Sequence, residues 1–161
     1  MIRRAVRTDV DTLIGLIRDL ADFERSPDSV KIDSDLLASA LFAESPTVFA
    51  HVADVDGEVL GMVIWFLNYS TWTGHNGIYL EDFYVRPEAR GRGIGRALFG
   101  ELATIAHRCG YQRIDWSVLN WNETALRFYR SLGSVPMDEW TGYRLSGTEL
   151  AALSGGEPLA T

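Results

Sequence analysis

Apolar residues recur every three or four positions in several stretches of the chain, and this spacing predicts helices with one apolar face. The predicted helices cover residues 9–24, which Thr8 precedes, and residues 34–43, 93–109 and 123–131. Ser26-Pro27-Asp28 interrupts the first pattern, and Gly133 follows the last one as a helix stop. We therefore expect helix boundaries close to these residues.

Between the helices the pattern has the period of two that is typical of strands. The predicted strands cover residues 2–6, 47–54, 58–69, 77–86, 113–119, 134–137 and 143–145. Asp56-Gly57 favours a hairpin turn, and residues 70–76 form a polar connection between the two strands beside them. The order is β-α-α-β-β-β-α-β-α-β-β, which predicts an α/β fold with a mixed, mostly antiparallel sheet and helices on both faces.

Length and composition favour one globular domain. The chain has 161 residues, of which 47% are apolar, and this is enough to bury a core and excludes a disordered protein. We expect a single domain over residues 1–146 and a C-terminal tail over residues 147–161, with residues 154–161 loose.

Charge and cysteine content exclude several classes of partner. The net charge is −7, and there is no basic stripe to neutralise phosphates, so we expect no nucleic-acid partner. No apolar run approaches the length of a membrane span, so we expect no membrane partner. The single cysteine, Cys109, permits no internal disulfide and suits the cytoplasm. The three histidines are too far apart in the sequence to suggest a metal site.

The sequence RGRGIG, residues 90–95, lies between a predicted strand and a predicted helix. A helix N-terminus offers backbone N–H groups and the positive end of the helix dipole. Glycines let the backbone curve around one anion, and Arg90, Arg92 and Arg96 add positive charge at its rim. A tight turn alone would explain one or two of the glycines but not the arginines. The pattern indicates a phosphate-binding turn.

Two common phosphate motifs do not fit this turn, because no Lys-Ser/Thr follows it and Arg96 stands where a dinucleotide fingerprint requires glycine. Arg90-x-x-Gly93-x-Gly95 instead resembles the pyrophosphate-binding motif of the GNAT superfamily of N-acetyltransferases. WNETALRFYRSLG, residues 121–133, is similar to the superfamily's other cofactor-side motif. The resemblance covers residues 2–146 and implies central strands that splay apart to admit the cofactor.

Residues 79–85, YLEDFYV, and residues 121–123, WNE, are similar to the diamine (spermidine/spermine) N-acetyltransferase subfamily, which includes enzymes acting on thialysine. Polyamine-acting members are expected to carry an acidic residue just before the loop tryptophan, whereas Ser70-Thr71 precede Trp72 here. The resemblance also implies a homodimer with acceptor sites near the interface.

The resemblance implies acetyl-CoA as the cofactor, with coenzyme A as the product. The turn at residues 90–96 would hold the pyrophosphate, and the strand end at 83–85 would pair with the pantetheine amides. An N–H group near Phe83 or Tyr84 would stabilise the developing oxyanion. The expected cofactor contacts are Phe83, Tyr84, Val85, Arg90, Gly91, Arg92, Gly93, Ile94, Gly95, Arg96, Asn122 and Tyr129.

Tyr129 resembles the superfamily's general acid, which protonates the departing thiolate. It follows Asn122, expected to hold the pantetheine arm, by seven residues, so one helix face would present both at a separation of about 10 Å. The alternative for Tyr129 is a core aromatic residue with a satisfied hydroxyl.

Glu81 and Asp82 are adjacent in a predicted strand, so alternation would direct their side chains to opposite faces. The resemblance implies that Glu81 removes a proton from the amine through a water molecule, or anchors an amine that is already neutral. Asp82 would bind a second cationic end across a subunit boundary, or face solvent or a hydrogen-bond partner. Trp72 and Trp140 are candidate walls for an alkyl-ammonium group, with packing as the alternative.

These residues favour an acetyl-CoA-dependent N-acetyltransferase acting on the primary amine of a small cationic acceptor, such as a diamine, a polyamine or thialysine. An acetyltransferase for an amino acid or an aminoglycoside is the alternative among enzymes. A sensor module that binds acetyl-CoA without turnover is the alternative outside them.

Overall fold

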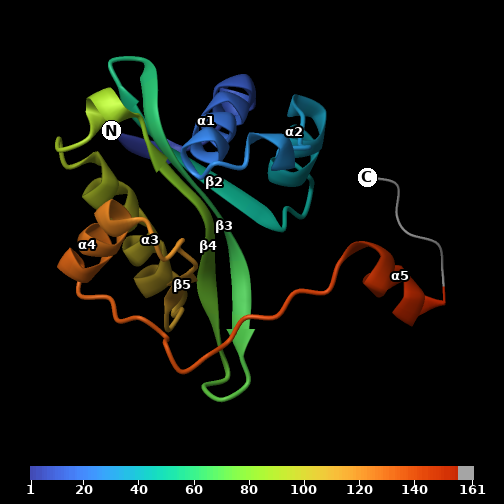
Figure 1. Ribbon diagram of the computed structural model, residues 1–161. Helices are drawn as coiled ribbons and strands as arrows, with labels where there is room; N and C mark the ends of the chain where they lie inside the picture. The colour runs from blue at the N-terminus through green and yellow to red at the C-terminus, as the bar shows by residue number, and fades with distance from the viewer. Residues whose placement is uncertain (156–161) are drawn as a thin grey trace. The chain divides into compact units, whose positions relative to one another are not determined.

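The computed structural model describes residues 1–155, which fall into two compact units, Met1–Leu126 and the described part of Arg127–Thr161 (Figure 1). The strands are β1 (Ile2–Arg4), β2 (Val48–Val55), β3 (Glu58–Ser70), β4 (His75–Val85) and β5 (Ile114–Trp116). The helices are α1 (Val10–Phe23), α2 (Ser34–Leu41), α3 (Ile94–Cys109), α4 (Glu123–Ser131) and α5 (Gly147–Ser154). Short 3-10 turns cover Arg7–Asp9, Pro27–Ser29 and Pro87–Ala89. The boundary between the units runs through α4.

Strands β1 to β5 form one sheet in chain order. Each neighbouring pair from β1 to β4 is antiparallel, whereas β4 and β5 are parallel. Helices α1 and α2 lie on one face of the sheet and α3 lies on the other (Figure 1). On the α3 face, Phe99 packs edge-on against Phe83 of β4, with ring centroids 5.1 Å apart. The predicted mixed, mostly antiparallel sheet with helices on both faces is confirmed.

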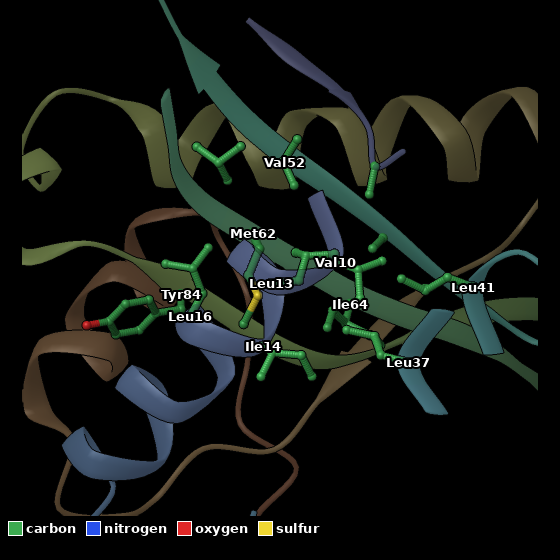
Figure 2. Packing of buried hydrophobic residues seen from close by; sticks show 13 residues of the cluster. Val10, Leu13, Ile14, Leu16, Leu37, Leu41, Val52, Met62, Ile64 and Tyr84 are labelled. Carbon is green, nitrogen blue, oxygen red and sulfur yellow. The ribbon is translucent and has the colours of Figure 1, made fainter. Parts of the chain in front are cut away.

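The main core lies between α1, α2 and the sheet (Figure 2). Leu13 and Leu16 of α1 and Met62 of β3 are fully buried, and Tyr84 extends the same cluster onto β4. Burial of an aliphatic side chain of this size stabilises the fold by about 1.5–3 kcal/mol. This packing therefore holds α1 firmly over β3 and β4. Within residues 1–155, no helix combines the length and the apolar content needed to cross a membrane.

Strand β4 has an irregularity in the middle of its pairing with β3. Ile64 pairs with Asp82 and Trp65 pairs with Leu80, so Glu81 is an extra residue that bulges from the ladder. The β4–β5 ladder ends at the same level, with Leu80 opposite Trp116, while β4 continues to Val85. The two strands therefore part at the bulge, which is the splayed geometry that the resemblance implied.

The strands predicted over residues 134–137 and 143–145 are wrong. The described chain between α4 and α5 contains no strand, and its large apolar side chains are exposed: Val135, Met137, Trp140, Tyr143 and Leu145. Alternation alone does not form a strand, because the backbone also needs a neighbouring strand to pair with.

Helix α5 was missed, although Ser146 precedes it and Gly155 ends it in the left-handed conformation. Other boundaries differ by a few residues. Strands β3 and β4 extend to Ser70 and His75, which shortens the predicted connection between them to a tight turn. Of the tail expected to be loose, residues 156–161 lie outside the described part of the chain.

Candidate active site

The glycine-rich turn begins α3. Gly91 and Gly93 have φ angles of 76° and 81°, in the left-handed region that favours glycine. Gly93 is the N-cap residue, and no side chain caps the helix there. A Cβ atom built on either glycine would meet no other part of the protein within 4 Å. The first N–H groups of α3 therefore open onto space that suits an anion such as a diphosphate.

The arginines of this turn differ in their surroundings. Arg92 and Arg96 are exposed beside the helix start. Arg90 instead donates from Nε to the carbonyl oxygen of Val85 at 2.9 Å. Its guanidinium carbon lies 5.4 Å from the ring centre of Phe23 and 5.6 Å from that of Tyr84. Arg90 thus ties the turn to β4 and to the end of α1, a role that sequence reasoning did not foresee.

The end of β4 presents backbone groups beyond the point where β5 stops. The Arg86 N–H bonds to β3 at 2.9 Å, so Tyr84 and Asp82 direct their N–H groups to β3 as well. Phe83 and Val85 direct theirs away from β3, toward the side on which β4 and β5 part. Of the two residues suggested as the oxyanion donor, the register therefore favours Phe83 over Tyr84.

Two other carboxylates act on Asp82 at the bulge. Burial, together with the charges of Glu81 and Glu24, raises the pKa of Asp82 to about 6 from an ordinary value of 3.8. Burial also raises the pKa of Glu24, which caps the C-terminal end of α1, whereas Glu81 is exposed. The arrangement favours a cation at this place. No group of three or more such side chains in residues 1–155 is arranged to hold a metal ion.

Sequence reasoning missed Glu24 because an acidic residue at a helix end usually faces solvent. It also treated the strand as regular. Leu80 and Asp82 are two residues apart, yet they pair with adjacent residues on β3, so side-chain alternation does not continue across Glu81. The prediction that the side chains of Glu81 and Asp82 point to opposite faces of the sheet therefore no longer follows, because it assumed a regular strand.

Asn122 has a structural role at the start of α4. Its Oδ1 atom accepts a hydrogen bond from the Ala125 N–H at 3.1 Å, and its carbonyl oxygen accepts the first helical bond, from Leu126, at 3.0 Å. The Nδ2 group is the part of this side chain that is left to donate to a ligand. Sequence reasoning had assigned Asn122 to ligand contact alone.

Tyr129 belongs to the second unit, near the end of α4. It is half-buried, its ring lies 5.6 Å from that of Phe128, and its carbonyl oxygen accepts a bond from Ser134 Oγ at 2.8 Å. Trp140 lies in the same unit, exposed in the irregular segment after α4.

Trp72 lies at the tip of the β3–β4 hairpin, with 87% of its surface exposed. Glu81 follows His75, at the base of that turn, by six positions along β4, which corresponds to about 20 Å. The structure therefore does not bring Trp72 beside Glu81 of the same chain.

An open helix start next to a parted pair of strands is the arrangement that the glycine-rich turn and the family resemblance implied, and comparison with known proteins agrees. The model of the acetyltransferase (GNAT) family matches residues 14–133. The chain belongs to the GNAT family. It is therefore an acetyltransferase, of a family whose acetyl donor is acetyl-CoA.

Similarity to acetyltransferases of known substrate extends over nearly the whole chain. A thialysine N-epsilon-acetyltransferase from Bos taurus is 37% identical, over 96% of this chain and 97% of its own length. An L-ornithine N5-acetyltransferase from Arabidopsis thaliana is 29% identical, over 94% of this chain and 86% of its own. An integron cassette protein from the mobile metagenome of V. cholerae has a similar structure, with a TM-score of 0.79, 30% identity and 96% of both chains covered.

Replacing Asp82 should stabilise this GNAT protein at neutral pH. A raised pKa means that the folded chain keeps a proton that the unfolded chain releases, so the wild type loses stability as the pH rises from about 4 to 6. We expect Asp82→Asn to raise the free energy of unfolding by roughly 1–2 kcal/mol at pH 7.5, with the gain disappearing near pH 4. Urea unfolding at both pH values measures this.

Asp28→Asn, on the exposed turn Pro27–Ser29, is the matched control, and its effect should stay within about 0.5 kcal/mol. A loss of stability in Asp82→Asn at pH 7.5 would contradict the electrostatic description of the bulge.

Proposed function

We propose that this protein transfers the acetyl group of acetyl-CoA to the primary amine of a small cationic acceptor of the thialysine, diamine or polyamine type. The observation that carries the proposal is the order of features along one strand. Strand β4 has an acidic cluster at its bulge and leads, through a short connection, into an anion-binding turn. The named relatives acetylate thialysine and ornithine, which both carry a side-chain primary amine.

On the cofactor side, the first-turn N–H groups of α3 bind the diphosphate, and Arg92 and Arg96 add charge beside it. Phe83 and Val85 offer backbone groups to the pantetheine arm in the manner of an added strand. Asn122 donates to the same arm from Nδ2. Arg90 acts mainly through the backbone, since its Nε holds the carbonyl of Val85.

On the acceptor side, Glu81, Asp82 and Glu24 attract the ammonium groups of the amine. Asp82 carries its negative charge only above a pH of about 6, so acceptor binding strengthens as the pH rises through that value. Trp140 contributes an apolar wall. Trp72, at the hairpin tip, reaches the acceptor only if the acceptor is long or if a second copy of the chain brings it there.

Bound acetyl-CoA supplies a thioester carbonyl carbon that accepts the amine. Glu81 takes a proton from the ammonium group through a water molecule and so frees the nitrogen lone pair. The Phe83 N–H stabilises negative charge on the carbonyl oxygen. The Tyr129 hydroxyl gives a proton to the sulfur as it leaves.

An amine panel tests the proposed reaction. We expect the highest kcat/KM with thialysine and ornithine, lower values with diamines and spermidine, and no product with leucine, which lacks a side-chain amine. Mass spectrometry of the acetylated amine is the safer readout, because the exposed thiol of Cys109 would react with reagents that detect free coenzyme A. Tight acetyl-CoA binding with no product from any amine would overturn the proposal that this protein is an amine acetyltransferase. It would favour a sensor module that binds acetyl-CoA without turnover.

Two variants separate the proposed proton transfers. Tyr129→Phe should lower kcat by about 100-fold or more while leaving acetyl-CoA affinity within about threefold, because only the leaving thiolate loses its proton donor. Glu81→Gln should lower kcat, because an amide cannot take the proton of the ammonium group. An unchanged kcat in Tyr129→Phe removes Tyr129 from the acid role, and an unchanged kcat in Glu81→Gln leaves Glu81 as a binding residue.

A homodimer is the proposed assembly. It is supported by the number of large apolar side chains that are exposed between α4 and α5, which include Met137 and Tyr143, because exposed apolar surface can mark an interaction site. Light scattering of the purified protein should give twice the chain mass of 18.0 kDa. Met137→Glu together with Tyr143→Lys should shift the mass toward one chain. A wild-type mass of one chain at micromolar concentration would contradict the proposal.

A further inference from the structure

Trp121 bridges two parts of the first unit that are distant in the sequence. Its ring centroid lies 5.9 Å from that of Phe23, and the guanidinium carbon of Arg25 lies 4.8 Å from the centre of its ring. The second distance is within the range of a cation–π interaction. We call these three residues the Trp121 clamp. Phe23 and Arg25 flank Glu24, so the clamp holds the residue at the end of α1 from both sides.

Arg25 occupies a backbone conformation that glycine normally fills. Its φ angle is 61°. The Ser26 N–H bonds to the Ala21 carbonyl at 2.9 Å and the Arg25 N–H to the Asp22 carbonyl at 3.1 Å, which is the Schellman end of a helix. A residue with a side chain is disfavoured at this position. Glycine would relieve the backbone but would remove the contact with Trp121.

The other side of the clamp is a tight turn that precedes α4. The Asn122 N–H bonds to the Leu119 carbonyl at 2.8 Å, and the Glu123 N–H bonds to the Trp121 carbonyl at 2.9 Å. The Asn122 side chain caps α4 from the same turn. Any change in the position of this turn therefore moves the indole, and with it the contacts to Phe23 and Arg25.

The clamp thus stands between the two halves of the proposed site. On one side is Asn122, a proposed cofactor contact. On the other is Glu24, which is partly buried and close enough for its charge to act on Asp82. Trp121 is 45% exposed, so its packing serves the core of the unit only in part.

We infer that the Trp121 clamp couples cofactor binding to acceptor binding, with Trp121 as a positioning residue. The inference rests on the proposed function. A cofactor held at Asn122 orders the turn before α4, the turn orders Trp121, and Trp121 fixes Glu24 beside Asp82. The acceptor then binds more tightly to the loaded protein, and by linkage it strengthens cofactor binding by the same factor.

Hydrogen–deuterium exchange with coenzyme A alone tests the clamp without any acceptor. In the wild type, coenzyme A should slow exchange both in the glycine turn, residues 91–97, and at the end of α1, residues 24–30. In Trp121→Leu the protection of residues 91–97 should remain, and the protection of residues 24–30 should fall by about half or more. Trp121→Phe should restore most of it, because a ring can still contact Phe23 and Arg25.

Arg7→Ala is the matched control, since Arg7 forms a similar contact with the ring of Phe42, at 5.2 Å, away from the proposed site. It should leave both protections unchanged. Protection at 91–97 but not at 24–30 in the wild type would overturn the clamp while leaving the proposed cofactor site intact. Protection at neither segment would overturn the cofactor site, and the clamp with it.

Calorimetry with thialysine provides the second readout. The wild type loaded with coenzyme A should bind thialysine about 10-fold more tightly than the unloaded protein, and Trp121→Leu should reduce this ratio to about 2-fold or less. If Trp121 had a merely structural role, Trp121→Leu would lower the melting temperature but leave the ratio of the two thialysine affinities unchanged. That result would contradict the inference. If thialysine does not bind the wild type at all, the acceptor assignment fails, and the exchange experiment alone decides on the clamp.

Discussion

Strand β4 is paired with β3 along its length but with β5 over a short stretch only, and the candidate site depends on this difference. Pairing with β3 keeps β4 rigid. The ladder with β5 ends at Leu80, and Phe83 and Val85 direct their N–H groups to the side on which the two strands part. The bulge at Glu81 lies at the same level. One local change in strand pairing therefore positions a backbone surface and an acidic side chain together.

The surrounding structure keeps this weakened edge in place. Tyr84 packs into the core formed with α1, and Arg90 holds both the ring of Tyr84 and the carbonyl of Val85. Asp82 works against stability, because its carboxylate is buried among like charges. The fold thus contains a strongly packed core on one side of β4 and an electrostatically unfavourable cluster beside it. Such a balance is typical of functional sites, where binding a cation offsets the cost of gathered charges.

Local sequence rules predicted the glycine turn and the helix over residues 123–131 well. The motif RGRGIG placed a glycine turn at the start of a helix, and Gly91 and Gly93 have the left-handed backbone that this required. The helix predicted over residues 123–131 has the observed bounds. The same rules failed at residues 134–137 and 143–145, where the strand-like alternation has no neighbouring strand in the described chain. A helix forms its backbone hydrogen bonds within one segment, whereas a strand needs a neighbouring strand to bond with. A helix can therefore be predicted from its own residues more reliably than a strand can.

The sequence by itself determined the element order from β1 to α4, the family and the glycine turn at the start of α3, since these depend on periodicity, glycine conformations and motifs within short segments. Only the tertiary structure decided that Glu81 is the bulged residue, that Arg90 turns toward Phe23 and Tyr84, and that Glu24 acts on Asp82. Each of these depends on strand register or on packing between segments that are far apart in the chain. A single sequence carries no local signal for either, because register and packing arise only when the elements meet.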